Sequence, residues 1–305
     1  MRAVVIESGA LHVRHVPTPE PGPGQVRGFY PAPPDAPPDI PGLEIAGEVD
    51  AIGAGVREVK VGDRVFGIVG GGAYAEHVIV PARTLAEIPD VLDFTEAAAM
   101  PEAALTAYDA MVSQAGLAAG EVVLINAVGS GVGTAAVQIA KAIGATSIGT
   151  ARTADKLARA KELGLDYGVV ATTDGKFADA VAEIARPDVV LELVGGSYVV
   201  ESLQAINERG RLMLVGLMAG RDAAIPLGLV LMRRITIQGT VMRARPLEEK
   251  IQLGQVLKRN LVPLMAQKKL VPIVERTFSL DEASAALELM ASNTTFGKIV
   301  LTTRD

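Results

Sequence analysis

The residues best suited to chemistry form a glycine-rich turn at 126–133, which reads N-A-V-G-S-G-V-G. The apolar run E-V-V-L-I-N-A-V-G predicts a buried strand before the turn, and T-A-A-V-Q-I-A-K-A-I-G predicts a helix after it. Glycines in such a turn permit a tight bend and a close approach of the backbone to a pyrophosphate, while the helix offers unpaired N–H groups and the positive end of its dipole. The strict G-x-G-x-x-G spacing is not met, because Val128 and Ser130 stand at its first two glycine positions. We therefore predict a dinucleotide site formed by Gly129, Ser130, Gly131, Val132 and Gly133.

The end of the next predicted strand bears on which dinucleotide is bound. NAD-binding sites place Asp or Glu there to hold the ribose 2′-hydroxyl. This strand ends in T-A-R-T, and the first carboxylate is Asp155, inside the following helix. Arg152 and Lys156 are instead placed to meet a 2′-phosphate. The pattern favours NADPH over NADH, with ordinary solvated charges at a helix start as the alternative.

Composition excludes several kinds of site. The 305 residues contain no cysteine, which rules out disulfides, thiolate catalysis, iron–sulfur clusters and cysteine-ligated zinc. The histidines are isolated at His12, His15 and His77, so we predict no metal site. Charged residues make up 21% of the chain, the formal net charge is −6 and the basic residues are scattered, which argues against a nucleic-acid partner.

The apolar runs and the first residues of the chain bear on its location. No apolar run reaches the roughly 20 residues that span a bilayer, so we expect no membrane association. The first residues, M-R-A-V-V-I-E, are typical of a strand rather than of a signal peptide, because charges interrupt them. We therefore expect a soluble cytoplasmic protein.

Strands and helices alternate through the middle of the chain. Strands are expected at 121–129, 146–151, 167–172, 188–195, 211–218 and 234–242, and helices at 134–144, 155–164, 177–185 and 197–210. This rhythm is typical of βαβ units and predicts an α/β fold with a doubly wound parallel sheet, a Rossmann domain at 95–245. Before and after it, proline-rich turns and alternating strands predict a mostly antiparallel, β-rich domain split between 1–94 and 246–305.

Stretches along nearly the whole chain resemble those of one protein family, and they occur in the same order as in that family. They are P-G-L-E with A-G-E-V at 41–49, K-V-G-D-R-V at 60–65, 70–75, P-E-A with L-T-A at 101–107, S-G-V-G-T-A-A at 130–136, G-G-S-Y at 195–198, Leu217-Met218 and G-K-I-V at 297–300. The chain resembles the zinc-free quinone oxidoreductase (zeta-crystallin-like) branch of the medium-chain dehydrogenase/reductases, and within it the tumour-suppressor-inducible subgroup. The resemblance implies that the split domain is a GroES-like catalytic domain.

The resemblance also implies roles for single residues. Zinc-dependent relatives have a ligand histidine where this chain has Leu43, so hydride transfer without zinc is expected, and Glu44 is assigned to structure or to the floor of the active site. Tyr30 corresponds to a tyrosine beside the substrate pocket that could donate a proton, with a loop-closing role as the alternative. Thr106 and Lys298 resemble cofactor-binding positions. Val194 is predicted to bind the cofactor, and Gly216 and Leu217, at the end of a later strand, would border the nicotinamide.

These expectations lead to one main function and two alternatives. The main one is NADPH-dependent reduction of a quinone, because without a metal the substrate must already be electrophilic. The alternatives are reduction of an enone or 2-alkenal double bond, and non-catalytic NADPH binding. A homodimer or larger homo-oligomer is expected through the unprotected edge strand at 234–241.

Two departures from the family pattern stand out. Gaps fall near Ser8-Gly9 and between Val26 and Arg27, where relatives have a long strand and a cofactor-facing loop. Either residues are missing from the sequence or the protein is a shortened variant, which an intact-mass measurement would decide. Relatives also often carry a tyrosine near the 2′-phosphate where this chain has Ala171-Thr172, which weakens the NADPH assignment.

Overall fold

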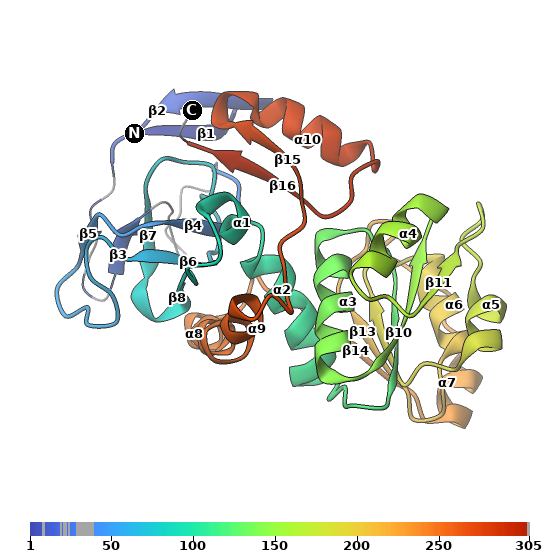
Figure 1. Ribbon diagram of the computed structural model, residues 1–305. Helices are drawn as coiled ribbons and strands as arrows, with labels where there is room; N and C mark the ends of the chain where they lie inside the picture. Colours follow the sequence, from blue (N-terminus) through green and yellow to red (C-terminus); the bar gives the residue numbers. More distant parts are fainter. Residues whose placement is uncertain (8–9, 19, 21–22, 24, 29–39, 304–305) are drawn as a thin grey trace. The chain divides into compact units, whose positions relative to one another are not determined.

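The computed structural model describes residues 1–305 except 8–9, 19, 21–22, 24, 29–39 and 304–305 (Figure 1). The chain forms two compact units. Unit 1 contains Met1–Leu105, Met242–Lys268 and Pro272–Asp305, and unit 2 contains Thr106–Val241 and Lys269–Val271. The chain first passes from unit 1 to unit 2 inside helix α2 (Pro101–Tyr108), after the predicted boundary between residues 94 and 95. A helix that continues from one unit into the other gives no break in the sequence pattern, so the pattern could not locate this crossing.

Unit 2 is built on a six-stranded parallel sheet with the order β11-β10-β9-β12-β13-β14. The strands are β9 (Val122–Ile125), β10 (Thr146–Ala151), β11 (Tyr167–Val170), β12 (Val189–Glu192), β13 (Arg211–Leu214) and β14 (Thr236–Gly239). The helices are α3 (Gly131–Ile143), α4 (Ala154–Glu162), α5 (Ala178–Ile184), α6 (Ser197–Ala205) and α7 (Leu227–Arg233). The strand order runs outward from β9 in one direction and from β12 in the other. The doubly wound fold is therefore confirmed, and its switch point lies between β9 and β12.

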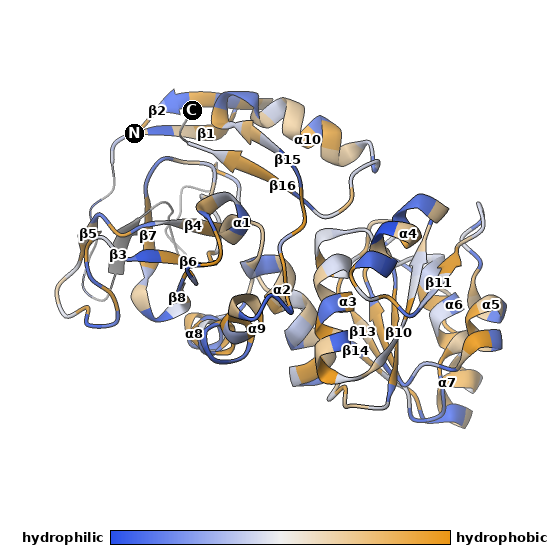
Figure 2. Cartoon of the chain, in the orientation of Figure 1, coloured by the Kyte–Doolittle hydropathy of each residue, from blue (hydrophilic) through white to orange (hydrophobic). Residues whose placement is uncertain are grey.

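The sheet of unit 2 is apolar along its central strands. Leu124, Ile125, Ile148 and Leu191 are fully buried, as expected where helices cover both faces of a parallel sheet. Much of α4 is coloured hydrophilic in Figure 2, as expected of a helix with many exposed residues. Polar side chains in such a sheet must find partners inside the protein, because water does not reach them.

Unit 1 is mostly antiparallel, as predicted. Its sheets are β1-β2, β5-β3-β7, β4-β6-β8 and the parallel pair β15-β16. The strands are β1 (Arg2–Glu7), β2 (Ala10–His15), β3 (Gln25–Gly28), β4 (Glu44–Glu48), β5 (Ala51–Ile52), β6 (Arg64–Ile68), β7 (Val78–Pro81), β8 (Leu85–Glu87), β15 (Val274–Ser279) and β16 (Lys298–Thr302). The α-helices that lie wholly in this unit are α1 (Phe94–Ala98), α8 (Leu247–Val256), α9 (Val262–Ala266) and α10 (Ala283–Ala291).

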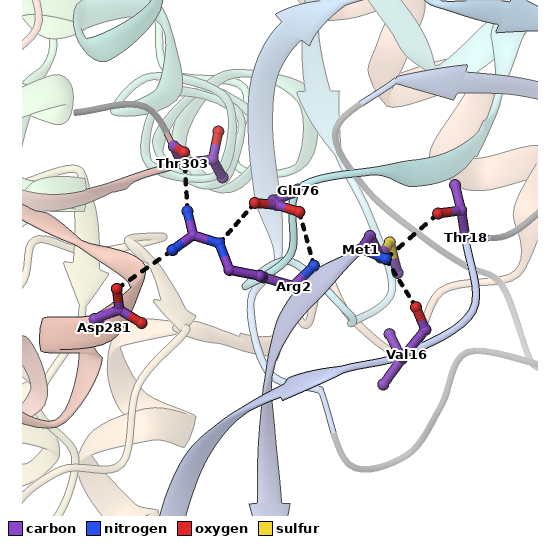
Figure 3. Close-up of polar contacts among 7 residues, drawn as sticks. All are labelled: Met1, Arg2, Val16, Thr18, Glu76, Asp281 and Thr303. Atoms are coloured by element: carbon purple, nitrogen blue, oxygen red, sulfur yellow. Dashed lines mark hydrogen bonds and ion pairs between the residues drawn. The ribbon is translucent and has the colours of Figure 1, made fainter.

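Arg2 joins the two ends of the chain within unit 1 (Figure 3). Its backbone N–H and its Nε both donate to the Glu76 carboxylate at 2.7 Å. Its terminal nitrogens reach an Asp281 oxygen at 3.3 Å and the carbonyl of Thr303 at 3.4 Å. One guanidinium therefore connects the first strand to segments that come almost 300 residues later.

A short segment of unit 2 is supplied from the far end of the chain. The buried Gln138 side chain in α3 donates to the Val271 carbonyl at 3.0 Å and accepts from the Val271 N–H at 2.8 Å. The side-chain amide pairs with this residue as a neighbouring backbone would. This pairing explains why Lys269–Val271 belongs to unit 2, although the residues on both sides belong to unit 1.

The helices differ from expectation at two places. Helix α7 was missed, because the sequence L-G-L-V-L-M-R fits a strand as well as a helix. The sequence of 247–267 is typical of one long helix, but the structure divides it into α8, a π-helical segment at Leu257–Leu261, and α9. Pro263 stands at the start of α9, where its missing N–H is tolerated. Among the described residues, no helix is long and apolar enough to cross a membrane.

The pair formed by Glu121 and Arg211 gives a test of stability in unit 2. The Glu121 carboxylate accepts from Arg211 Nη2 at 2.7 Å and from the Ala118 N–H at 2.9 Å. The Arg211 hydrogen bond holds the pKa of Glu121 below its ordinary value. A group with a lowered folded-state pKa adds stability above its unfolded pKa and loses that contribution as the pH falls through the folded pKa.

We expect Glu121→Gln to lower the free energy of unfolding by about 1–2 kcal/mol at neutral pH, because a charge-assisted hydrogen bond is lost. The difference from the native protein should vanish below the folded pKa of Glu121. Urea unfolding at neutral pH and near pH 3 measures both effects. Glu183→Gln, at an exposed position in α5, is the control and should change stability little. Equal losses in the two variants would contradict the prediction.

Candidate dinucleotide site

The turn between β9 and α3 has a defined backbone. Ser130 caps α3, since its Oγ accepts from the Gly133 N–H at 3.0 Å. The left-handed residue of the turn is Ala127, with φ of 51°, and neither Gly129 nor Gly131 has a positive φ. Gly129 and Gly131 therefore do not use the left-handed conformation that glycine permits. The turn uses it at Ala127, two residues before Gly129, where it costs a non-glycine residue about 1 kcal/mol or more.

Glycine is required at position 133 for a different reason, because there is no space for a side chain. A Cβ atom on this residue would lie 2.5 Å from the Ala127 carbonyl oxygen and 2.7 Å from the Val128 backbone. The first turn of α3 therefore packs directly on the loop that precedes it. This close packing brings the N–H groups at the start of α3, which have no partner within the helix, to the carboxyl edge of the sheet. Gly131 and Val132 are half-buried there, and the arrangement fits a pyrophosphate.

A buried polar network lies at the switch point beneath this turn, and the sequence analysis missed it. Asn126 directly follows β9, and its Nδ2 donates to Glu192 Oε2 at 2.7 Å and to Ser202 Oγ at 2.9 Å. Its Oδ1 accepts from Thr150 Oγ1 at 2.7 Å. All four residues are fully buried. A signal existed, because Asn126 and Glu192 are polar residues at the ends of otherwise apolar strands, where a partner inside the protein is required.

Glu192 is the last residue of β12, and its carboxylate accepts four hydrogen bonds. Oε1 accepts from the N–H groups of Val194 and Gly195 at 2.9 and 3.0 Å, and Oε2 accepts from Ser202 Oγ at 2.9 Å as well as from Asn126. Burial raises the pKa of Glu192 above its ordinary value, although these hydrogen bonds act against that shift. The group is therefore a buried acid whose donors are all neutral.

The loops after β12 and β13 are joined to each other. The Ala219 N–H donates to the Val194 carbonyl at 2.8 Å, and the Gly196 N–H donates to the Gly220 carbonyl at 3.1 Å. A Cβ on Gly216 would overlap the Leu193 carbonyl, so glycine is required for this approach. The predicted residues Val194, Gly216 and Leu217 lie in these loops at the same edge of the sheet as the β9–α3 turn, and Leu217 is 43% exposed.

The residues predicted to read the 2′-phosphate lie after β10. Arg152 is exposed directly after this strand, and Lys156 is half-buried in α4. Burial raises the pKa of the Tyr198 phenol, and the nearby charge of Arg152 acts against the shift. Tyr198, near the start of α6, was not predicted as a site residue. It brings a phenol close to Arg152.

The remaining predicted residues have separate surroundings. The side-chain oxygen of Thr106 is buried and has no hydrogen-bond partner among the described residues, which fits a position that awaits a ligand. In unit 1, Lys298 Nζ pairs with the Glu44 carboxylate, which also accepts from the Glu102 N–H at 2.9 Å. Burial acts to lower the pKa of Lys298, but the Glu44 carboxylate outweighs it and the pKa is raised. Tyr30 lies outside the described residues.

Comparison with known proteins identifies the family. The model named alcohol dehydrogenase GroES-like domain matches residues 6–90, and the model named zinc-binding dehydrogenase matches 131–257. A quinone oxidoreductase of Pseudomonas aeruginosa is 31% identical, with 92% of each chain covered. The crystal structure of Escherichia coli quinone oxidoreductase complexed with NADPH superposes with a TM-score of 0.86 at 25% identity, covering 98% of this chain and 99% of that one. The chain belongs to the quinone oxidoreductase type of medium-chain dehydrogenase/reductases.

Members of this family are oxidoreductases, and two further observations bear on this member. The polyketide synthase GfsB of Streptomyces halstedii is 36% identical over 90% of this chain, which spans only 5% of that longer protein. The matching family model is named for zinc, yet this oxidoreductase has no cysteine that could serve as a zinc ligand. In the described part of the chain, no three His, Asp or Glu side chains are grouped as a metal site would require.

The packing at Gly133 gives a test of this site. We expect Gly133→Ala to lower the free energy of unfolding by about 2 kcal/mol or more, because its Cβ would meet backbone atoms that cannot move aside. Gly228→Ala in α7 is the matched control, because a Cβ there would meet nothing within 4 Å. The control should raise stability by up to about 1 kcal/mol, as alanine favours a helix. Thermal unfolding of both variants provides the measurement, and a neutral Gly133→Ala would refute the packing argument.

Proposed function

We propose that this oxidoreductase reduces quinones with NADPH by hydride transfer that needs no zinc. The observation that carries the proposal is the β9–α3 turn, where a capped helix start and the closely packed Gly133 fit a pyrophosphate at the switch point. Family membership supports a nicotinamide cofactor. NADPH rather than NADH is supported by Arg152 and Lys156, which follow β10 where an NAD site would have a carboxylate.

The residues of the chain would then bind and position rather than react. The backbone of Ser130–Gly133 would hold the pyrophosphate, and Arg152 with Lys156 would hold the 2′-phosphate. Val194, Gly216 and Leu217 would border the nicotinamide, which supplies a hydride, and Thr106 and Lys298 would add cofactor contacts. Tyr30 or water would deliver any proton to the reduced oxygen. Catalysis on this account comes mainly from orientation and exclusion of water.

The choice of a quinone follows from the chemistry of the residues. With no Lewis acid to polarise a carbonyl, the acceptor must already be electrophilic, as quinones and conjugated enones are. An enone or 2-alkenal double-bond reductase and a non-catalytic NADPH-binding protein are the competing functions.

The deciding experiment is NADPH oxidation with a panel of quinones, enones and 2-alkenals, repeated with NADH and in the presence of a strong chelator. We expect the fastest turnover with NADPH and a quinone, unchanged by the chelator. Faster turnover of enals would establish the double-bond reductase. NADPH binding without turnover of any acceptor would establish the binding protein, and activity lost on chelation and restored by zinc would overturn the metal-free mechanism.

Cofactor preference is tested at Arg152. We expect Arg152→Ala to weaken NADPH binding by about 1–3 kcal/mol and to leave NADH binding nearly unchanged, because a charged hydrogen bond to the 2′-phosphate is lost. Lys161→Ala, at an exposed position in α4, is the control for general loss of positive charge. Titration of both variants with both cofactors provides the measurement. Equal weakening of NADPH and NADH would show that Arg152 does not read the 2′-phosphate.

We further propose a homodimer, or a larger assembly built from it, that pairs β14 with its copy. Strand β14 is an edge of the sheet, and the Thr236 and Thr240 N–H groups donate inward to the neighbouring strand at 2.9 and 3.0 Å. Because N–H directions alternate along a strand, the Gly239 N–H faces away from the sheet. Three large apolar side chains of nearby α7 are about three-quarters exposed, namely Leu227, Leu231 and Met232.

Gly239→Pro should yield monomers, because it removes an outward amide and leaves the inward hydrogen bonds of β14 in place. Sedimentation at micromolar concentration measures the assembly, and circular dichroism confirms that the variant is folded. A native protein that sediments as a monomer would disprove the dimer. A folded Gly239→Pro variant that remains a dimer would place the interface elsewhere.

A further inference from the structure

The two ends of β12 carry matching pairs of side chains. At the carboxyl end, the Asn126 amide donates to the Glu192 carboxylate at 2.7 Å. Just before the amino end, the Asn207 amide donates to the Asp188 carboxylate at 3.0 Å. Each pair joins β12 to a neighbouring segment of the same unit. The first pair lies at the switch point, beside the loops proposed to hold the cofactor, and the second lies at the opposite edge of the sheet.

The hydrogen bonds of Glu192 match a carboxylate. Its two oxygens accept four hydrogen bonds, which matches their four lone pairs. A protonated acid would present an O–H toward donors, and of the four groups the Ser202 hydroxyl alone could accept it. The charge is fully buried, so the N–H groups of Val194 and Gly195 supply much of its solvation. These two amides cannot move away without leaving a buried charge exposed to apolar surroundings, and the Val194–Gly195 turn is therefore fixed.

The same carboxylate fixes the other loop through Asn126. Both protons of the Asn126 amide are used by Glu192 and Ser202, and its oxygen is used by Thr150. The side chain therefore has one orientation, and Asn126 is the residue at which the glycine-rich turn begins. A single hydrogen bond between Asn126 and Glu192 thus connects the loop after β9 with the loop after β12.

We propose that Glu192, acting through Asn126, is a positioning residue that fixes the separation of these two loops and thereby the affinity for the cofactor. The proposal rests on the proposed function, because it requires that the two loops bind NADPH. Glu192 is fully buried beneath the loops, and it acts through their backbone rather than by touching the cofactor.

The test replaces Asn126 by Asp, which sets a second carboxylate against Glu192. Two adjacent buried carboxyl groups cannot both ionise without a large cost, so the pKa of the pair is raised. Below that pKa the new carboxyl group, in its protonated form, would donate to Glu192 and accept from Thr150, as the amide does. The loss of NADPH affinity in Asn126→Asp should therefore grow as the pH rises. Asn207→Asp is the matched control, since it sets a second carboxylate against Asp188 at the other edge.

The double variant Asn126→Asp with Glu192→Gln exchanges the acid and the amide. The glutamine oxygen can still accept from the Val194 and Gly195 N–H groups, and its amide can donate to the new carboxylate. Every donor of the network again has an acceptor, so cofactor binding should return. This rescue also covers the case in which Asn126→Asp alone fails to fold.

NADPH fluorescence gives the dissociation constant directly, because the reduced nicotinamide is excited at wavelengths that protein side chains do not absorb. Near pH 8 we expect Asn126→Asp to raise the dissociation constant for NADPH at least about tenfold, with a smaller effect near pH 5.5. The KM for NADPH should rise in parallel, while kcat at saturating NADPH stays within about threefold. Asn207→Asp should stay within about twofold of the native protein, and the double variant within about threefold.

Hydrogen exchange supplies a readout that needs no cofactor. The Val194 and Gly195 amides should exchange faster in Asn126→Asp than in the native protein, and should be protected again in the double variant. Native-like NADPH binding by Asn126→Asp near pH 8, equal weakening by Asn207→Asp, or a folded double variant that does not recover would each overturn the positioning role. A native protein that binds neither NADPH nor NADH would instead overturn the proposed function and this proposal with it.

Discussion

A buried charge held by neutral donors is the constraint on which the arrangement of unit 2 depends. The central strands are apolar because helices cover both faces of the sheet, so a polar group at a strand end must be fully paired. Glu192 meets this requirement with two loop amides, a serine and an asparagine. Such a network is favourable only when every member is satisfied, since one missing partner leaves a desolvated group. The loops at the switch point are therefore fixed by the same interactions that allow the sheet to fold.

Unit 1 is held together in a different way. Its strands come from the first and the last of its three chain segments, and charged pairs connect them. Arg2 bonds to Glu76 and to residues near the end of the chain, while Lys298 of β16 pairs with Glu44 of β4. These side chains keep part of their surface in water, so pairing them costs less desolvation than burying Glu192 does. Partly exposed ion pairs suit an assembly of distant segments, whereas in the nearly continuous unit 2 the buried carboxylate is held by neutral donors.

The sequence predicted the fold because its signals are local. Alternating apolar runs and helices define the doubly wound sheet, and the absence of cysteine removes whole classes of site chemistry. The position of Gly133 was informative, because its close packing against Ala127 depends on residues only a few positions away. What was missed depends on contacts between distant residues. The pairing of Asn126 with Glu192 joins residues 66 positions apart, and no periodicity records it. Helix α7 was missed because nearly all its residues are apolar, on its exposed side as well as its packed side, so the sequence fits a strand as well as a helix.

The division of the chain also governs the order in which the protein can fold during synthesis. All of unit 2 except Lys269–Val271 is present once Val241 has left the ribosome, so its sheet can form early. The strands β1 to β8 are made before it, yet Asp281 and Thr303, which bond to Arg2, are made last. The core cluster in which Val4 packs with Leu280 and Ala283 therefore stays incomplete until the last segment is made. Until then the apolar residues of the first strand lack part of their core and are open to other chains.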